Sequence, residues 1–416
     1  MPAVGPARTG SFDAAVTGIG MVTAGGVGTT ATWDRVCEAA GTAAREVPGL
    51  AGMPVGFACV VPDFDAATLI GRRKAWRLDR SNQLAIAAAA EAVADAGLVP
   101  SAWDGARVGV VLGCGLGGAG SWEKQYDVLR EAGPRQVSPT LIPMLVPNMS
   151  AGYVAMEIGA RGPNMVTATA CASGTTAVGM ARELLRSGAC DVVLTGGTES
   201  CVVPSISTGF SQMGALSERH EDIARSSRPF DARRDGFVLA EGAAVLVLER
   251  QADAEARGAR VRARVSGYGA SADAYNATAP DPEGAGAELA LRAALADAAL
   301  SPGDIDHVNA HGTSTPLNDT MEARLIRRVL GDRPSVTSVK GVLGHSLGAA
   351  GAIEAAVTVL SMEHSFVPPT ANLESQDVEA DIDVVAKAGR EGEVRAAVSN
   401  SFGFGGQNAV LLFTAA

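Results

Sequence analysis

The chain has 416 residues, a net charge of −11 and only 4% aromatic residues. This length predicts two domains or one large layered fold, and the acidic balance excludes general nucleic-acid binding, which needs a basic face. The six cysteines, at positions 37, 59, 114, 171, 190 and 201, have neither a disulfide framework nor zinc-ligand spacing. The first residues lack the apolar core of a signal peptide, and no segment approaches the roughly 18 apolar residues that span a bilayer, so we expect a cytoplasmic protein that does not bind membranes.

The N-terminal part of the chain predicts alternating strands and helices. Residues 15–20 predict a strand, residues 85–98 a helix, and residues 107–113 a second strand that ends in a glycine turn. Residues 164–169 form a β-branched run, which predicts a short strand. The small residues Ala172, Ser173 and Gly174 then let the chain turn sharply into an apolar, periodic helix.

Cys171 lies in this turn from strand to helix. A helix N-terminus favours the thiolate, which is the nucleophilic form, so we expect the pKa of Cys171 to lie between roughly 3.5 and 7.5. The same backbone N–H groups can hold an oxyanion. The alternative interpretation is a small buried hydrophobic residue, as for most free cysteines.

The middle of the chain predicts buried strands and a junction between two halves. Apart from Asp191, residues 191–194 and 243–248 are apolar, which is typical of strands covered by helices on both faces. The charged stretch 249–264 is the best candidate for the junction. We therefore divide the chain into an N-terminal half, residues 11–252, and a C-terminal half, residues 253–416.

The second half repeats the plan of the first. Residues 85–113 and 288–312 both predict a helix, a loop that contains proline, a strand and a glycine turn, and residues 264–269 resemble residues 15–20. Coincidence between alanine-rich helices is the alternative, but the combined order of elements favours duplication. The sequence therefore predicts a layered α/β fold.

Three glycine-rich motifs follow in the second half: NAHGTSTP at 309–316, KGVLGHS at 340–346 and NSFGFGG at 400–406. Two of them place a histidine, His311 and His345, in a glycine turn. Together with CASG at 171–174, these motifs resemble those of the β-ketoacyl-acyl-carrier-protein synthases of the elongating, KAS II type. The resemblance runs from about residue 14 to residue 413. It implies a thiolase-like fold, an αβαβα five-layer sandwich of two pseudo-repeated halves.

The resemblance also implies a decarboxylative Claisen condensation. Cys171 would take an acyl chain as a thioester, and His311 and His345 would hydrogen-bond to a malonyl-type extender as it loses carbon dioxide. The oxyanion hole would be the backbone N–H groups of Cys171 and Phe404. Phe404 lies between two glycines and would also act as a gate, although such glycines equally permit a tight turn. The substrates would be carried on the phosphopantetheine arm of an acyl carrier protein, and we expect no other cofactor.

Further residues match family positions around this site. Lys340 and Glu354 would lie behind the histidines, where a structural ion pair is the alternative to direct participation. In some relatives a structural monovalent cation is surrounded by the residues that match Asn309, Glu354, Ser399 and Asn400. We expect no other metal.

The remaining matches concern the substrate and the carrier protein. The phosphopantetheine contacts would be Thr278, Thr313 and Thr315, although the last two can instead stabilise their own turn. The acyl pocket would be lined by Leu116 and Leu141, for which apolar core is the alternative. The carrier protein would dock on Arg72, Arg73, Lys74, Arg77 and Arg219, for which an ordinary solvated face is the alternative.

Departures from the family pattern bear on the pathway. The family usually continues FGGTN, whereas this chain has Gln407 before Asn408, and residues 39–62 form a short, alanine-rich segment. These features favour type II polyketide or specialised fatty acyl biosynthesis over a housekeeping fatty-acid synthase that acts as a homodimer. We expect a dimer, either a homodimer or a heterodimer with a subunit that resembles a chain-length factor.

Two other classes of protein are disfavoured. A catalytically silent chain-length partner would have lost the nucleophile, whereas this chain keeps Cys171, His311 and His345. A thiolase that uses coenzyme A would need a second catalytic cysteine near its C-terminus. This chain has no cysteine after Cys201.

Overall fold

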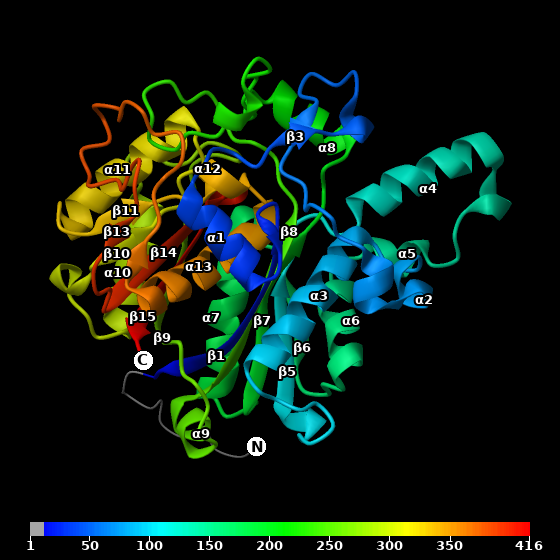
Figure 1. The fold of residues 1–416 in the computed structure, drawn as a ribbon, viewed down its shortest axis with the longest axis horizontal. Helices are drawn as coiled ribbons and strands as arrows, with labels where there is room; N and C mark the ends of the chain where they lie inside the picture. The colour runs from blue at the N-terminus through cyan, green and yellow to red at the C-terminus, as the bar shows by residue number, and fades with distance from the viewer. Residues whose placement is uncertain (1–11) are drawn as a thin grey trace.

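One sheet of 11 strands, covered by helices, dominates the computed structural model, which describes residues 12–416 (Figure 1). The ten strands along its main path are β1 (Ala14–Thr23), β5 (Val108–Gly113), β6 (Asn164–Thr167), β7 (Val192–Glu199), β8 (Gly242–Arg250), β9 (Ala263–Ala272), β10 (His307–Asn309), β11 (Ser335–Thr337), β14 (Ala396–Gly403) and β15 (Gln407–Ala415). The short strands are β2 (Gly26–Val27), β3 (Arg45–Glu46), β4 (Phe57–Ala58), β12 (Phe366–Val367) and β13 (Arg390–Glu391).

Helices lie on both faces of the sheet. They are α1 (Thr29–Glu38), α2 (Arg72–Ala75), α3 (Arg80–Asp95), α4 (Ala119–Ala132), α5 (Leu141–Leu145), α6 (Met149–Ile158), α7 (Ser173–Arg186), α8 (Pro204–Gln212), α9 (Gln251–Ala256), α10 (Ala285–Asp297), α11 (Pro316–Leu330), α12 (Lys340–Leu343) and α13 (Ala350–His364). Within residues 12–416 no helix combines the length and the apolar character that crossing a membrane requires.

The strand order repeats within the chain. The first half has the order β6-β5-β7-β8-β1, and the second has β11-β10-β14-β15-β9. Each half has one strand, β5 or β10, that pairs in parallel with both of its neighbours. Each half also has one strand, β8 or β15, that is antiparallel to both of its neighbours. β1 and β9 join the two halves by a short antiparallel pairing. The repeated order confirms the pseudo-repeat and the thiolase-like fold predicted from the sequence.

The layers follow from which helices pack on which strands. α7 and α13 contact each other and strands of both halves, so they form the central layer. α3 and α6 cover the outer face of the first half, and α10 that of the second. The central layer is built from small side chains, such as Ala181 and Ala356, which are fully buried. Abundant alanine thus lets helices and strands pack closely in five layers.

The predicted elements are present with shifted ends. The run 164–169 forms only β6, since the chain leaves the strand before Cys171, and the predicted strand at 305–312 is confined to β10. The junction 249–264 contains the end of β8, all of α9 and the start of β9. The division between residues 252 and 253 falls inside α9 and stays a prediction. Residues 1–11 lie outside the described part of the chain. They include the first residue of the predicted N-terminal half and most of the segment inspected for a signal peptide.

Matching glycines mark the repeat at atomic scale. Gly20 in β1 packs so closely against α3 that a Cβ atom there would lie 2.0 Å from the Ala88 carbonyl oxygen. Gly269 in β9 has the same relation to α10, at 2.0 Å from the Ala290 oxygen. A methyl group fits at neither place, because contacts to backbone atoms cannot relax without moving a helix.

We predict that Gly20→Ala and Gly269→Ala each lower the free energy of unfolding by at least about 2 kcal/mol, because the added methyl group pushes α3 or α10 off the sheet. Gly49→Ala is the matched control, since no atom lies within 4 Å of the added Cβ. Urea unfolding followed by circular dichroism measures the differences. Equal stability of Gly20→Ala and the wild type would contradict this packing.

Candidate active site

A strained turn holds Cys171 between β6 and α7. The residues Ala170–Ala172 form a short 3-10 helix, and Ala170 has a φ of 48°, in the left-handed region that non-glycine residues rarely adopt. Ser173 fixes the turn: its Oγ accepts from the Thr169 N–H at 2.9 Å and donates to the Ala170 carbonyl at 2.6 Å. Strain of this kind persists only where the surroundings impose it, and it is typical of functional sites.

His311 follows β10 and is held through its backbone. The N–H groups of His311 and Gly312 each donate at 2.8 Å to the carboxylate of Glu322, which is fully buried in α11. Asn400 Nδ2 donates to the same carboxylate at 3.0 Å. One buried acid therefore fixes the histidine turn relative to β14.

His345 comes one turn after α12 and is anchored on the chain that leads into β8. Its backbone N–H donates to the Val238 carbonyl at 2.8 Å, and its own carbonyl accepts from the Ala240 N–H at 3.0 Å. The ring packs edge-on against Phe237, with ring centroids 5.3 Å apart. Both the backbone and the ring of His345 are thus fixed by apolar, buried neighbours.

The three predicted catalytic side chains converge. The Cys171 sulfur and one ring nitrogen of each histidine all lie within 4.8 Å of one another, and the two imidazole rings cross edge-on at 5.4 Å. Cys171 is 9% exposed, and each histidine is 2% exposed. Cys171 precedes both histidines by more than 130 residues, yet the three side chains form one compact centre that is shielded from solvent.

Burial overturns the predicted pKa of the thiol. Burial raises the pKa of Cys171 to about 11, although the Lys340 charge and a hydrogen bond from the Phe404 backbone N–H to the sulfur both lower it. The predicted pKa below about 7.5 is wrong because desolvation outweighs the favourable groups at this depth. The resting nucleophile is a neutral thiol that must lose its proton during the reaction.

The histidines are neutral, and the tautomer of one is fixed. Burial and then the Lys340 charge lower the pKa of His311 and His345 well below the ordinary value, and each histidine ring therefore has one N–H donor. Lys340 Nζ lies 3.4 Å from His311 Nδ1. Because an ammonium group only donates, Nδ1 accepts and the proton of His311 is on Nε2.

Lys340 connects the histidine to a buried acid. Its Nζ donates to the His311 carbonyl at 2.6 Å and forms an ion pair with Glu354, and both side chains are 2% exposed. Neither charge faces solvent, so removing one partner would leave the other buried and uncompensated. The predicted network behind the histidines therefore exists as a buried ion pair that also touches the His311 ring.

The comparisons with known proteins agree with this geometry. The family model "Beta-ketoacyl synthase, N-terminal domain" matches residues 12–254, and "Beta-ketoacyl synthase, C-terminal domain" matches residues 262–374. The chain belongs to the β-ketoacyl synthase family.

Curated relatives and solved structures cover most of the chain. The 3-oxoacyl-[acyl-carrier-protein] synthase 2 of Synechocystis sp. is 42% identical over 360 residues, which are 86% of each chain. The enzyme of the same name from Staphylococcus aureus (strain COL) is 41% identical over 86% of this chain and 87% of its own. The ishigamide ketosynthase/chain length factor superposes with a TM-score of 0.91 at 34% identity, over 98% of this chain and 100% of the other.

A second solved structure contains a carrier protein. AntDE:AntF, a type II PKS acyl-carrier protein in complex with its ketosynthase bound to the hexaketide, superposes with a TM-score of 0.89 at 32% identity. The match covers 98% of this chain and 100% of that chain. At these identities the two solved structures and the curated relatives support the same family.

Several buried oxygen atoms lack a hydrogen-bond partner among residues 12–416. Four of them are Asn309 Oδ1, Glu354 Oε2, Ser399 Oγ and Asn400 Oδ1. Asn309 and Ser399 are register partners on β10 and β14, and Asn309 Nδ2 donates to the Glu354 carbonyl at 3.3 Å. This set of unpaired oxygens is the one named from the sequence for a cation, and its chemistry fits a hard ion.

The threonines predicted to hold the substrate arm lie around the opening of the site. Thr313 and Thr315 share a hydrogen bond at 2.8 Å, whereas Thr278 is exposed in a turn closed by Asn276. The loop of Thr278 lies against the Phe404 loop, because the Gly405 N–H donates to the Ala277 carbonyl at 2.8 Å. Their contact with a phosphopantetheine arm stays a prediction.

The predicted oxyanion hole and gate adjoin Cys171. A Cβ atom on Gly403 would lie 3.0 Å from the Cys171 nitrogen, so the end of β14 passes directly over the nucleophile turn. Phe404 follows, half-buried, and its ring lies 6.2 Å from that of Phe210. Gly405 has a φ of 78°, which only glycine adopts easily.

The predicted acyl-pocket residues lie beside α5. Leu116 is 39% exposed in the turn after β5, and Leu141 begins α5. Gly117 and Gly118 bring this turn into contact with the backbone of α5, where a Cβ atom on Gly118 would lie 2.0 Å from the Met144 oxygen. The two leucines therefore lie on two segments that contact each other, and their role as pocket lining stays a prediction.

The basic cluster predicted for docking is exposed but not uniform. Arg72 and Arg73 form no ion pair within the described part of the chain, whereas Lys74 pairs with Glu157 at 2.6 Å. Arg77 stacks on the Trp76 ring at 4.8 Å. Arg219 donates to the Arg233 carbonyl and lies 3.6 Å from the Asp235 carboxylate, which offsets its charge.

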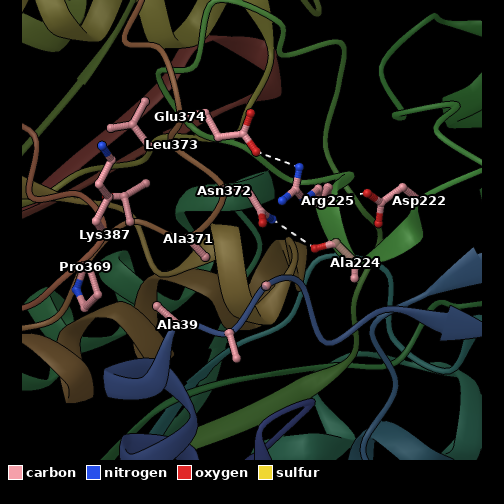
Figure 2. Close-up of a pocket in the computed structure, with 13 residues that line it drawn as sticks. Ala39, Asp222, Ala224, Arg225, Pro369, Ala371, Asn372, Leu373, Glu374 and Lys387 are labelled. Carbon is pink, nitrogen blue, oxygen red and sulfur yellow. Dashed lines mark hydrogen bonds and ion pairs between the residues drawn. The ribbon is translucent and has the colours of Figure 1, made fainter.

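A separate surface pocket, of about 320 Å³, contains none of the predicted site residues (Figure 2). Three of its charged side chains pair with each other: Arg225 lies between Asp222 and Glu374, at 3.6 and 2.7 Å. Asn372 donates to the Ala224 carbonyl. Lys387 also lines the pocket.

Sequence reasoning missed three residues that shape the site: Glu322, Phe237 and Glu199. Glu322 lies in α11 at helical spacing from Asn318, on the buried face of the helix, which is a signal the sequence contains. Phe237 lies in none of the predicted helices or strands, so no periodic pattern points to it. Glu199 is the last residue of β7. In the sequence, a charged residue at this position indicates only that the strand ends there and does not indicate a site.

We predict that alkylation of Cys171 by iodoacetamide rises about tenfold per pH unit between pH 7 and 9 without levelling off, because a thiol with a raised pKa is mostly protonated throughout this range. A thiolate with a pKa below 7.5 would react at a nearly constant rate instead. Peptide mass spectrometry measures the rate, and Cys171→Ala identifies the signal. N-acetylcysteine in the same solutions calibrates the reagent.

Proposed function

We propose that the chain catalyses the decarboxylative Claisen condensation of a malonyl-acyl-carrier-protein extender onto an acyl chain bound to Cys171, giving a 3-oxoacyl-acyl-carrier-protein. The convergence of one sulfur and two neutral imidazoles within 4.8 Å carries this proposal. A neutral donor suits an enolate that forms and disappears within the cycle, since a permanent cation would hold it too tightly.

The first step transfers the acyl chain. The Cys171 sulfur attacks the carrier thioester carbonyl, and the proton of the thiol passes through a base to the carrier sulfur, which leaves as a thiol. The thiol must lose its proton, and His311 cannot accept it at Nε2, which already bears a proton. Neutral His345 is therefore the base. The backbone N–H groups of Cys171 and Phe404 hold the oxyanion, and one such donor typically lowers the barrier by about 3 kcal/mol.

The second step forms the carbon–carbon bond. The malonyl group loses carbon dioxide, and the electron pair of the broken bond forms an enolate whose oxygen accepts from His311 Nε2–H and from the N–H of neutral His345. The enolate carbon attacks the acyl carbonyl on Cys171, and the cysteine sulfur leaves as a thiolate, which takes up one proton from water to restore the resting thiol. Lys340 holds the His311 tautomer through Nδ1 and remains paired with Glu354.

The proposed pathway is type II polyketide or specialised fatty acyl biosynthesis. The two solved polyketide-type structures, with TM-scores of 0.91 and 0.89, support it, together with Gln407 in place of the usual threonine. A housekeeping fatty-acid elongation enzyme is the second candidate, and the 42% identity to a 3-oxoacyl-[acyl-carrier-protein] synthase 2 favours it. Both candidates use the same chemistry.

The proposed partners are an acyl carrier protein and a second subunit. β6 is an edge strand of the sheet. α4 projects from the body of the molecule (Figure 1), and its Trp122 and Tyr126 side chains are exposed. An unpaired strand edge and exposed aromatic rings support a dimer. The ishigamide ketosynthase/chain length factor supports a heterodimer, and a homodimer is the alternative.

We also propose a monovalent cation as a structural component, with no further cofactor beyond the phosphopantetheine of the carrier. Asn309, Glu354, Ser399 and Asn400 would hold it through their unpaired oxygens. A bound cation would contact Glu354 Oε2, the oxygen that Lys340 does not bind, and would keep β10, β14 and α13 in register behind the histidines.

We predict that Cys171→Ala loses both acyl loading and condensation. His311→Ala should still load but condense at least about 100-fold more slowly. His345→Ala should show the same loss of condensation and, in addition, load more slowly. Intact-mass analysis with acyl carrier proteins that bear different chains, alone and with candidate subunits, follows each step. Thermal melting checks that the variants fold. Full elongation by Cys171→Ala would refute the proposed function.

We predict that reversing Arg72, Arg73 and Lys74 to glutamate lowers affinity for the acyl carrier protein at least about tenfold at low salt, because the carrier is expected to present acidic side chains. The matched control reverses Arg324, Arg327 and Arg328 on α11, which changes the net charge equally. Fluorescence anisotropy measures binding. An equal loss in both variants would attribute the effect to overall charge and remove the docking site.

A further inference from the structure

Glu199 is a buried acid that the proposed condensation does not use. It ends β7, is fully buried, and lies close enough to Cys171 to influence its charge. A buried carboxylate is retained only where its oxygens are satisfied. The groups that satisfy Glu199 come from two different turns.

The first turn follows β5 and carries Leu116. The Gly115 N–H donates to Glu199 at 2.7 Å, and the Leu116 N–H donates at 3.2 Å. Cys114 adds its S–H donor at 3.6 Å. The backbone of the predicted acyl-pocket residue is thus bonded directly to this carboxylate.

The second turn follows His345 and carries Leu347. The Gly348 N–H donates to Glu199 at 3.3 Å. Leu347 has a φ of 45° and belongs to the same buried apolar cluster as Cys171. A non-glycine residue in the left-handed region needs its surroundings to hold it there, and the bond from Gly348 is one such restraint.

Glycines let the two turns meet over the carboxylate. A Cβ atom on Gly115 would lie 2.9 Å from Glu199 Oε2, and one on Gly348 would lie 2.6 Å from the same oxygen. A Cβ atom on Gly348 would also lie 2.5 Å from the Gly115 nitrogen, so the turns touch each other. This close approach couples the Leu116 turn to the turn that follows His345.

We propose that Glu199 is a positioning residue that holds the Leu116 and Leu347 turns together and thereby sets which acyl chain lengths Cys171 accepts. The inference rests on the proposed function. A short acyl group needs only the centre around Cys171, whereas a longer chain must pass the Leu116 turn. Burial raises the pKa of Glu199 to about 7, while the N–H donors lower it, so the ionised form that accepts from both turns gains in population as the pH rises above neutral.

The test compares acyl loading of two-carbon and ten-carbon chains. Glu199→Gln keeps the shape but turns one acceptor into a donor that faces N–H groups. We expect loading of the ten-carbon chain to fall about tenfold and loading of the two-carbon chain to fall less than about twofold, as loss of a buried hydrogen bond to a charged group would give. Intact mass at timed intervals measures both rates, with the change in KM and kcat recorded separately.

Two further variants keep the test decisive. Cys114→Ala removes only the S–H donor and should shift the ratio in the same direction by about twofold, as expected for one weak neutral hydrogen bond. Glu249→Gln is the matched control, because this buried glutamate bonds Thr17 and Arg257 and touches neither turn. It should lose stability and keep the wild-type chain-length profile.

The outcomes separate the two proposals. If the wild type loads no acyl chain, the proposed function fails. If the wild type loads both chains and Glu199→Gln keeps its profile, or loses both chains equally, the positioning role alone is overturned. A selective loss of the longer chain in Glu199→Gln and Cys114→Ala, but not in Glu249→Gln, supports it.

Discussion

The buried ammonium group of Lys340 is the interaction on which the site depends. It pairs with Glu354, donates to the His311 carbonyl and lies against the His311 ring. Its charge also lowers the pKa of both histidines and of Cys171. One cation thus fixes the position of His311 and its tautomer, and it adds to the effect of burial, which keeps both imidazoles neutral. Because this cation is already paired, it does not act as a free charge in the reaction.

The pseudo-repeat explains why these groups meet. In each half the second, third and fourth strands end at the same edge of the sheet. In the first half these ends carry the Cys114 turn, Cys171 and Glu199, and in the second half they lead to His311, Lys340 and Phe404. Ligand sites in open α/β sheets form at the carboxyl ends of strands, and here two copies of such an edge face each other around α7 and α13. The nucleophile and the lysine occupy equivalent places in the two copies.

The sequence predicts this arrangement where local pattern decides it and fails where depth decides it. The glycine motifs and the repeated order of elements identify Cys171, His311 and His345 and the layered fold, because each is a local property of a turn or a strand. The shift in the pKa of Cys171 was predicted in the wrong direction, because a helix N-terminus is visible in the sequence and full burial is not. For the same reason Glu322 and Glu199 were missed: an acidic residue is usually exposed, and only the fold turns these two inward.

The neutrality of the centre has a consequence for the proposed condensation. The malonyl carboxylate enters a site walled by Phe237 and Phe402, whose rings lie 5.3 and 5.9 Å from the histidine rings. The imidazoles are uncharged, and the nearest ammonium, on Lys340, is already paired with Glu354. A carboxylate is poorly solvated in such surroundings, whereas an enolate oxygen finds the imidazole donors. The site therefore stabilises the negative charge on the enolate oxygen better than the same charge on the malonyl carboxylate. This difference is the differential binding that a decarboxylation requires.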